Sequence, residues 1–380
     1  MRFIVTGGGT GGHVYPAIAI AEQIESIQGS TVEFIGSVTG PEGTAAKKAG
    51  LRFLGLQLSG LVGKRPLSML RALRLFTAAA LRCRKLFAES PPDCVIGTGG
   101  YAAAPACFAA AWLKVPLVLH EMNLRPGLVT RMLSRRAGVV AVAFEGTIDL
   151  LPRWANTAVT GVPVRREIEE LADEGVRQKT KESALAAFRL ESGRRTLLVF
   201  GGSQGALAIN EAIWDAVNDI AHRSDIQILH LTGSSGFNSN RRRSTEHGLS
   251  GGKLLYRSEA YCERMQDAYS VADLALTRAG AGTVAELAAA GVPAILVPFP
   301  HSSGGHQVEN ARELERRGAA KVVLQQGESA QSAISEALRL LDDEAELRQM
   351  RTAMSAMSEV PGAKGIAGIV EELTLRRTST

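Results

Sequence analysis

The chain has 380 residues and a formal net charge of +5, and 45% of its residues are hydrophobic. That length suits two domains of ordinary size, and the apolar fraction is enough for two buried cores. The small positive charge fits a phosphate-bearing ligand or an anionic membrane surface and gives no indication of nucleic-acid binding.

Neither a secretory signal nor a membrane span is expected. The first residues form a predicted strand directly, and the longest apolar run, about Ala102 to Leu113, is too short to cross a bilayer. The four cysteines (Cys83, Cys94, Cys107 and Cys262) show neither a CxxC pair nor metal-ligand spacing. We therefore expect reduced, mostly buried thiols in a cytosolic protein.

A strand followed by a glycine-rich loop opens the chain. Arg2 to Val5 is the predicted strand, Gly7 to His13 is the loop, and Pro16 opens a predicted apolar helix. The glycines of the loop satisfy GxGxxG, which is typical of dinucleotide sites. The next predicted strand, Val32 to Ile35, is not followed by an acidic residue, so a nicotinamide cofactor is not expected.

The same unit occurs a second time, with a strand from Thr196 to Phe200, a loop from Gly201 to Gly205 and a helix from Ala206 to Ile220. Two such units predict two doubly wound α/β domains that face one cleft, with the boundary near Gly161 to Arg165. Further predicted strands are Val95 onward, Pro116 to His120, Val139 to Phe144, Thr157 to Gly161, Ile226 to Leu231, Lys253 to Tyr256 and Leu274 to Thr277. The C-terminal part, Ser332 to Leu375, is predicted to be helical.

The segment from Arg278 to Asn310 predicts a glycine turn, a short helix, a buried strand and a polar loop. Thr283 is the predicted N-cap of the helix, and Gly291 provides the left-handed position after its end. A helix N-terminus near side-chain amides suits an anionic, hydroxyl-rich ligand such as a nucleotide sugar. Alternatively, Glu286 completes a capping box with Thr283. The polar side chains expected at the carboxyl end of the strand are His306, Gln307 and Asn310.

Three polar side chains are candidates for proton transfer. His13 lies beside the first glycine loop, and histidine titrates near neutral pH, so it is a candidate general base. A satisfied surface or capping histidine is the alternative. His120 and Glu121 form a second polar pair at a strand end, with the same two interpretations.

A diphosphate site is expected at the second glycine loop. Ser203 and Gln204 lie there at a helix N-terminus, where amide groups and the helix dipole favour anions. Arg165 is placed to add a charge-assisted contact from across the cleft. We find no D-x-D triplet and no His/Asp cluster with ligand spacing, so no metal is expected at the diphosphate.

The segment from Leu67 to Phe87 predicts a basic amphipathic helix that can lie on an anionic bilayer. An ordinary surface helix whose arginines extend toward solvent is the alternative. Its apolar members include Leu70, Leu73, Phe76 and Leu81, and its basic members are Arg71, Arg74, Arg82, Arg84 and Lys85.

Taken together, these motifs resemble the MurG family, the UDP-N-acetylglucosamine–lipid I N-acetylglucosaminyltransferases of bacterial peptidoglycan synthesis. The resemblance covers nearly the whole chain. Its motifs are Gly7 to His13, Gly99-Gly-Tyr101, His120-Glu-Met-Asn123, Gly161-Val-Pro-Val-Arg165, Gly201-Gly-Ser-Gln-Gly205, Arg278 to Gly291 and His306-Gln307. The chain departs from the family pattern at Met122, Val162 and Gly304-Gly305.

The resemblance implies a GT-B fold with the acceptor on an N-terminal domain (1–164) and the donor on a C-terminal domain (165–354). The last helix, about 355–380, is implied to pack back on the first domain. The family's reaction is an inverting transfer of N-acetylglucosamine without a metal or another cofactor. A peripheral position on the cytoplasmic face of the inner membrane and contacts with other cell-wall synthesis proteins are also implied.

Site residues are implied motif by motif. On the donor side these are Arg165, Ser203 and Gln204 at the diphosphate, Glu286 at the ribose, the backbone near Cys262 at the uracil, and Gln307, His306 and Asn310 at the sugar, with Arg278 and Thr283 as further substrate-binding residues. On the acceptor side Thr10, Gly11, Gly12 and Asn123 line the cleft, His13 is the candidate base, and Tyr101, His120 and Glu121 are alternatives.

Three rival functions remain open at this point. A UDP-N-acetylglucosamine 2-epimerase can share the two-domain fold but needs no lipid acceptor, so the basic helix and the first glycine loop argue against it. The others are a glycosyltransferase acting on another lipid and a non-catalytic subunit that binds a sugar nucleotide.

Overall fold

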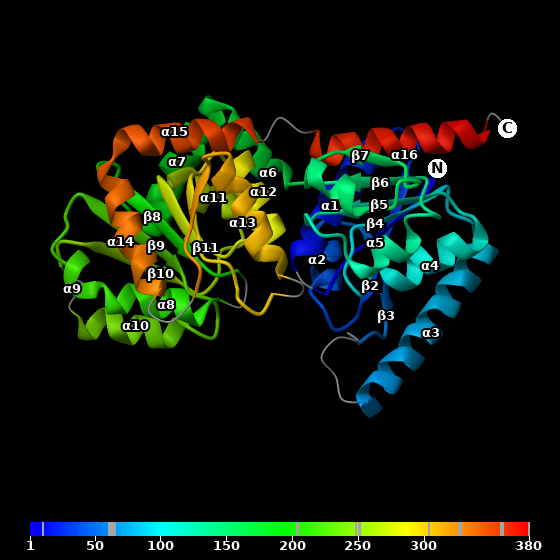
Figure 1. Cartoon of the computed structure of the whole chain (residues 1–380), viewed down its shortest axis with the longest axis horizontal. Helices are drawn as coiled ribbons and strands as arrows, with labels where there is room; N and C mark the ends of the chain where they lie inside the picture. The colour runs from blue at the N-terminus through cyan, green and yellow to red at the C-terminus, as the bar shows by residue number, and fades with distance from the viewer. Residues whose placement is uncertain are drawn as a thin grey trace. The chain divides into compact units, whose positions relative to one another are not determined.

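The computed structural model describes residues 1–9, 11–59, 66–202, 205–247, 249, 252–302, 305–325, 329–357 and 361–378. The chain divides into two compact units, each described here by itself (Figure 1). Unit 1 comprises Met1–Arg165 together with Val360–Thr380, and unit 2 comprises Arg166–Glu359. Among the described helices, none is both long enough and apolar enough to cross a membrane.

Unit 1 contains a seven-stranded parallel sheet with the strand order β3-β2-β1-β4-β5-β6-β7. The order reverses direction between β1 and β4, which is the position where open α/β sheets bind ligands beyond the carboxyl ends of their strands. The strands are β1 Arg2–Thr6, β2 Thr31–Ser37, β3 Arg52–Leu56, β4 Cys94–Gly97, β5 Leu117–Glu121, β6 Val139–Val142 and β7 Thr157–Val159.

Helices cover both faces of this sheet because successive strand residues point to opposite sides. Phe3 and Val5 pack against α1 and α16, whereas Ile4 packs in the cluster that includes α3 and α4. The C-terminal helix α16 is therefore part of the core of unit 1. The helices are α1 Gly11–Glu25, α2 Glu42–Lys48, α3 Pro66–Glu89, α4 Ala104–Leu113, α5 Leu128–Leu133, the 3-10 helix η1 Glu145–Leu150, and α16 Gly362–Thr378.

Unit 2 contains a six-stranded parallel sheet with the order β10-β9-β8-β11-β12-β13, which reverses direction between β8 and β11. The strands are β8 Arg195–Phe200, β9 Ile226–Leu231, β10 Leu255–Glu259, β11 Leu274–Thr277, β12 Ala294–Leu296 and β13 Ala320–Val322. The helices are α6 Arg166–Glu169, η2 Glu170–Ala172, α7 Glu174–Phe188, α8 Leu207–Asp215, α9 Val217–Ile220, α10 Phe237–Glu246, α11 Met265–Val271, α12 Ala281–Ala289, α13 His306–Arg316, α14 Ser329–Asp342 and α15 Glu344–Ala356.

Two predicted helix starts were wrong. Helix α1 begins at Gly11, so Pro16 lies inside the helix rather than at its first position. Helix α12 has Gly280 as its N-cap, so Thr283 is a helical residue and does not cap. The left-handed position at Gly291 is confirmed, with a φ of 59°.

Candidate functional site

The reversal point of the first sheet brings two glycine loops together. The loop after β1 carries Gly7 to Gly9, and the loop after β4 carries Thr98 to Tyr101. A Cβ atom on Gly100 would lie 1.9 Å from the carbonyl oxygen of Gly8, and a Cβ on Gly9 would lie 2.7 Å from the Tyr101 ring. The two backbones therefore approach so closely at Gly100 that only glycine fits there, and at Gly9 the Tyr101 ring occupies the space that a side chain would need.

His13 is held against the second of these loops from two sides. Its Nδ1 lies 2.9 Å from the carbonyl oxygen of Thr98, and the hydroxyl of Thr98 donates to the carbonyl oxygen of His13 at 2.8 Å. A carbonyl oxygen only accepts, so Nδ1 carries the hydrogen and the lone pair of the neutral ring resides on Nε2. A histidine in this tautomer, fixed by its backbone contact, is oriented to take a proton at Nε2.

His120 has a different environment at the end of β5. It is 1% exposed, its Nε2 donates to the carbonyl oxygen of Gly161 at 2.9 Å, and its Nδ1 has no hydrogen-bond partner among the described residues. Burial lowers the pKa of His120 from 6.5 to about 4, so the ring is neutral at physiological pH. These contacts connect β5 to the segment after β7.

Glu121 also uses its side chain within the protein. One carboxylate oxygen accepts from the backbone and side-chain amides of Asn123, and the other accepts from the Gly127 amide and the Thr130 hydroxyl, each at 2.8 Å. With four donors and 5% exposure, this carboxylate organises the turn from β5 into α5. Asn123 is oriented by it.

In unit 2 the glycine loop after β8 approaches the segment that follows β9. Gly205 has a φ of 76°, and a Cβ atom there would lie 2.2 Å from the carbonyl oxygen of Thr232, so the glycine is needed for close approach. The predicted diphosphate residues Ser203 and Gln204 lie outside the described residues, as does Thr10 in unit 1. Gly11 and Gly12 begin α1.

Several buried polar atoms at the carboxyl edge of the second sheet have no hydrogen-bond partner among the described residues. They include Oγ1 of Thr277 at the end of β11, and Nδ1 of His306 and Oδ1 of Asn310 on α13. Buried polar atoms in folded proteins are usually paired, so such a group indicates a place that a polar ligand completes. The predicted polar loop is thus partly helical, because α13 begins at His306.

Other predicted donor residues lie around the same edge. Glu286 accepts from the Tyr269 hydroxyl at 2.9 Å, and Gln307 accepts from the Phe299 amide at 2.9 Å. The capping box of Glu286 with Thr283 is excluded because Thr283 is not the N-cap.

Arg278 braces the segment after β12. It donates to the carbonyl oxygens of Val297 and Pro298 and lies over the Phe299 ring, 5.4 Å from its centroid. Burial lowers its pKa from the usual value.

Two further predicted residues have contacts within their own unit. The Arg165 guanidinium lies 4.8 Å from the ring centroid of Tyr15 in α1, which is a cation–π distance. The thiol of Cys262 donates to the carbonyl oxygen of Arg264 at 3.2 Å. All four cysteines are buried and none forms a disulfide, in agreement with the predicted reduced, mostly buried thiols.

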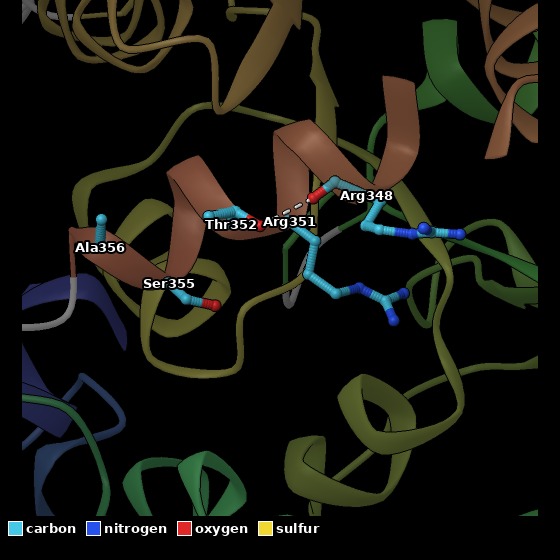
Figure 2. Close-up of a pocket in the computed structure, with 5 residues that line it drawn as sticks. All are labelled: Arg348, Arg351, Thr352, Ser355 and Ala356. Atoms are coloured by element: carbon cyan, nitrogen blue, oxygen red, sulfur yellow. Dashed lines mark hydrogen bonds between the residues drawn. The ribbon is translucent and has the colours of Figure 1, made fainter. Parts of the chain in front are cut away.

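A surface hollow occurs elsewhere in unit 2, along α15 (Figure 2). Figure 2 shows Arg348 and Arg351 pointing away from the helix on the side that also carries Ser355, while the Thr352 hydroxyl donates to the Arg348 carbonyl. Arg351 lies 3.6 Å from Asp273, which precedes β11, so the hollow is at the amino edge of the sheet. It is distinct from the edge that carries the predicted donor residues.

Sequence reasoning missed Thr98 and Glu42. Thr98 directly precedes the Gly99-Gly-Tyr101 motif, and its position after a strand was a usable signal. Glu42 forms its key contact with Gly9, 33 residues away, and no local pattern indicates it. Among the described residues, no group of three or more His, Cys, Asp or Glu side chains is arranged to hold a metal ion.

Comparison with known proteins supplies the family. The glycosyltransferase family 28 N-terminal domain matches residues 3–142, and the family's C-terminal domain matches residues 196–366. The chain is 35% identical to a protein of Desulforamulus reducens over 99% of this chain and 100% of that one. It is 34% identical to a protein of Halothermothrix orenii over 98% and 99%. Both are named UDP-N-acetylglucosamine–N-acetylmuramyl-(pentapeptide) pyrophosphoryl-undecaprenol N-acetylglucosamine transferase.

Solved structures agree with this result. The structure of Acinetobacter baumannii MurG superposes with a TM-score of 0.75 at 27% identity, covering 98% of this chain and 99% of that one. A UDP-GlcNAc 2-epimerase from Neisseria meningitidis superposes with a TM-score of 0.68 at 15% identity, covering 99% and 100%, and shows the shared fold alone. The predicted GT-B fold of two Rossmann-like domains is confirmed, and the chain is a glycosyltransferase that belongs to the MurG family within glycosyltransferase family 28.

Proposed function

We propose that this protein transfers N-acetylglucosamine from UDP-N-acetylglucosamine to the muramyl sugar of undecaprenyl-pyrophosphoryl-N-acetylmuramyl pentapeptide (lipid I), which gives lipid II. The observation that carries the proposal is the full-length similarity to relatives named for this reaction. Each sheet also offers a glycine-loop reversal point, where α/β folds bind ligands. Unit 1 takes the acceptor and unit 2 takes the sugar nucleotide.

His13 is the general base on the acceptor side. Its Nδ1–H is committed to the Thr98 carbonyl, so Nε2 is the nitrogen that removes the proton from the acceptor hydroxyl. The resulting alkoxide attacks the anomeric carbon of the donor in a single displacement, and UDP leaves with the bonding electrons. The alternatives His120 and Glu121 are buried and hydrogen-bonded within unit 1, which makes them positioning residues. Tyr101 packs against Gly9 and shapes the loop.

The donor lies at the carboxyl edge of the second sheet. There Thr277, His306 and Asn310 present buried polar atoms that hydroxyl groups of the sugar would pair with. The carboxylate of Glu286, oriented by Tyr269, accepts the ribose hydroxyls, and the glycine loop before α8 receives the diphosphate at a helix N-terminus. UDP departs stabilised by this loop. No step requires a metal, and EDTA is not expected to inhibit the reaction.

Helix α3 provides attachment to an anionic bilayer. Its inner side is packed, with Cys83 and Phe87 buried and Phe76 in an edge contact with Phe108 of α4. The exposed apolar side chains on and beside it are Met69, Leu70, Leu73, Leu81 and Trp112 of α4. An ordinary surface helix presents polar groups on its outer side, whereas this one combines exposed leucines with arginines, as interfacial helices do. We propose that the protein is peripheral on the cytoplasmic face of the membrane, with α3 as its attachment.

The test of the reaction is UDP release from UDP-N-acetylglucosamine in EDTA, with and without a short-chain lipid I analogue. Release that depends on the analogue supports the transferase. Release without acceptor, accompanied by the manno epimer or free sugar, would contradict it and favour the epimerase whose fold the chain shares. Diacylglycerol serving as well as the analogue would exclude lipid I as the specific acceptor.

The membrane proposal is tested by co-sedimentation with vesicles containing anionic phospholipid. Leu70→Ser and Leu73→Ser together should weaken binding by about 100-fold or more, because each removes about 1.5–3 kcal/mol of apolar transfer free energy when fully buried. Leu150→Ser, at a similarly exposed leucine of η1, is the matched control. Equal binding of both proteins would show that α3 does not contact the bilayer.

A further inference from the structure

A buried glutamate lies beneath the first glycine loop. Glu42 is the first residue of α2 and is 0% exposed, and its Oε1 accepts a hydrogen bond of 2.7 Å from the amide of Gly9. Glutamate is common in the first turn of helices, where it usually interacts with its own helix. Here the side chain accepts instead from the amide of a loop residue 33 positions earlier in the chain.

Three glycines make room for this carboxylate. A Cβ atom on Gly8 would lie 1.9 Å from Oε1 of Glu42, one on Gly40 would lie 1.8 Å from Oε2, and one on Gly36 would lie 2.9 Å from the side-chain carbons. Segments from two strand ends and from the turn before α2 therefore close around a single side chain. Any larger residue at these positions would displace the carboxylate.

The second oxygen, Oε2, is buried and has no hydrogen-bond partner among the described residues. Leaving a buried acceptor unsatisfied is costly, so an apolar side chain would fill this space more stably. Filling space therefore does not explain the residue. What a carboxylate provides, and an apolar side chain does not, is a strong acceptor for the Gly9 amide.

The Gly9 contact is connected to His13 through the interlocked loops. Gly8, next to Gly9, donates its amide to the Gly99 carbonyl at 3.4 Å and packs its own carbonyl against Gly100. The loop carrying Gly99 and Gly100 begins at Thr98, whose carbonyl and hydroxyl hold His13. A shift of the first loop is thus transmitted to the surroundings of the imidazole over a few backbone contacts.

We infer that Glu42 is a positioning residue for the acceptor step, which holds the glycine loop and thereby sets His13. The inference rests on the proposed function of His13 as base. Glu42 is fully buried in unit 1, so its removal should affect the rate of transfer and leave donor recognition in unit 2 unchanged.

The test is steady-state kinetics of Glu42→Ala, Glu42→Gln and Ala46→Gly with UDP-N-acetylglucosamine and a short-chain lipid I analogue. Glu42→Ala should lower kcat about 100-fold, the usual effect of a displacement near 1 Å in an active site. Glu42→Gln retains an oxygen for the Gly9 amide and should recover kcat to within about fivefold of wild type, since a neutral acceptor is weaker than a charged one. The KM for the donor should change less than twofold in all three.

Ala46→Gly is the matched control for destabilised α2, because Ala46 is fully buried in the same helix and packs in the core of unit 1. Hydrogen exchange of the peptide covering Gly7 to Gly9 should accelerate in Glu42→Ala and stay near wild type in Ala46→Gly. Equal kcat values for Glu42→Ala and Ala46→Gly at equal folded fraction would overturn the inference, as would a rise in donor KM that matches the loss of kcat. Inactivity of the wild type toward the analogue would instead refute the proposed function.

Discussion

Replacing Gly100 with alanine tests whether the two glycine loops of unit 1 really interlock. Gly100 has a φ of 77°, in the left-handed region that alanine enters at a cost of about 1–2 kcal/mol. Its new Cβ would lie 1.9 Å from the Gly8 carbonyl oxygen, whereas such contacts essentially never fall below 3.0 Å. The backbones must therefore separate by about 1.1 Å.

Gly29 provides a control with the same backbone geometry. Its φ is also 77°, but a Cβ atom there would meet nothing within 4 Å. Gly29→Ala should consequently lose only the conformational cost of about 1–2 kcal/mol. Gly100→Ala should lose a further 1–3 kcal/mol or so, which is typical of overpacking. Because the displaced loop holds His13, the kcat of the Gly100→Ala enzyme should also fall about 100-fold.

Urea unfolding gives the two free energies, and transfer to the lipid I analogue gives kcat at a temperature where both variants remain folded. The two variants should differ in both quantities. Equal free energies of unfolding and equal kcat values would refute the close approach of Gly8 and Gly100 as the feature that orders this site.

Three further predictions follow from individual side chains. Because burial lowers the pKa of His120 from 6.5 to about 4, the unfolded chain binds the extra proton between these pH values, and stability present above pH 6.5 is lost as pH falls toward 4. In urea unfolding, the free energy of unfolding of the wild type should fall by about 1.4 kcal/mol per pH unit more steeply than that of His120→Asn over this range. An equal pH dependence of the two proteins would contradict the pKa shift. Tyr269→Phe removes the hydroxyl that orients Glu286 and should raise the donor KM about 3–10-fold with kcat unchanged; an unaltered KM would exclude Glu286 from donor binding. Arg278→Lys loses contacts with two carbonyls and should lower the free energy of unfolding by about 2 kcal/mol, and a neutral effect in thermal unfolding would show that the bracing is unimportant.

Hydrophobic patterning was sufficient to predict most of the fold. Strand β9, Ile226–Leu231, is buried along its whole length and has the predicted bounds, because a parallel strand covered on both faces is continuously apolar. The start of α1 was wrong because proline was assigned to the first turn, although Pro16 is accommodated inside the helix. Local sequence signals thus predicted which helices and strands exist better than they predicted where each one begins and ends.

The candidate site was less accessible to sequence reasoning. His120 and Glu121 have the residue types of a proton-transfer pair, but only the structure shows that their polar atoms are used by Gly161 and by the turn into α5. Glu42 was missed for the converse reason, since its role depends on glycines distant in the sequence. Burial and hydrogen-bond partners distinguish these cases, and neither is encoded in a local motif.

The most direct measurement is the structure of the product formed from UDP-N-acetylglucosamine and a short-chain lipid I analogue, with the configuration of its new glycosidic bond determined by NMR. A single displacement initiated by His13 inverts the anomeric carbon of the α-linked donor, so the account predicts a β-linked disaccharide on the analogue. An α-linkage would contradict the single displacement, and the absence of any disaccharide would contradict the assignment of lipid I as the acceptor.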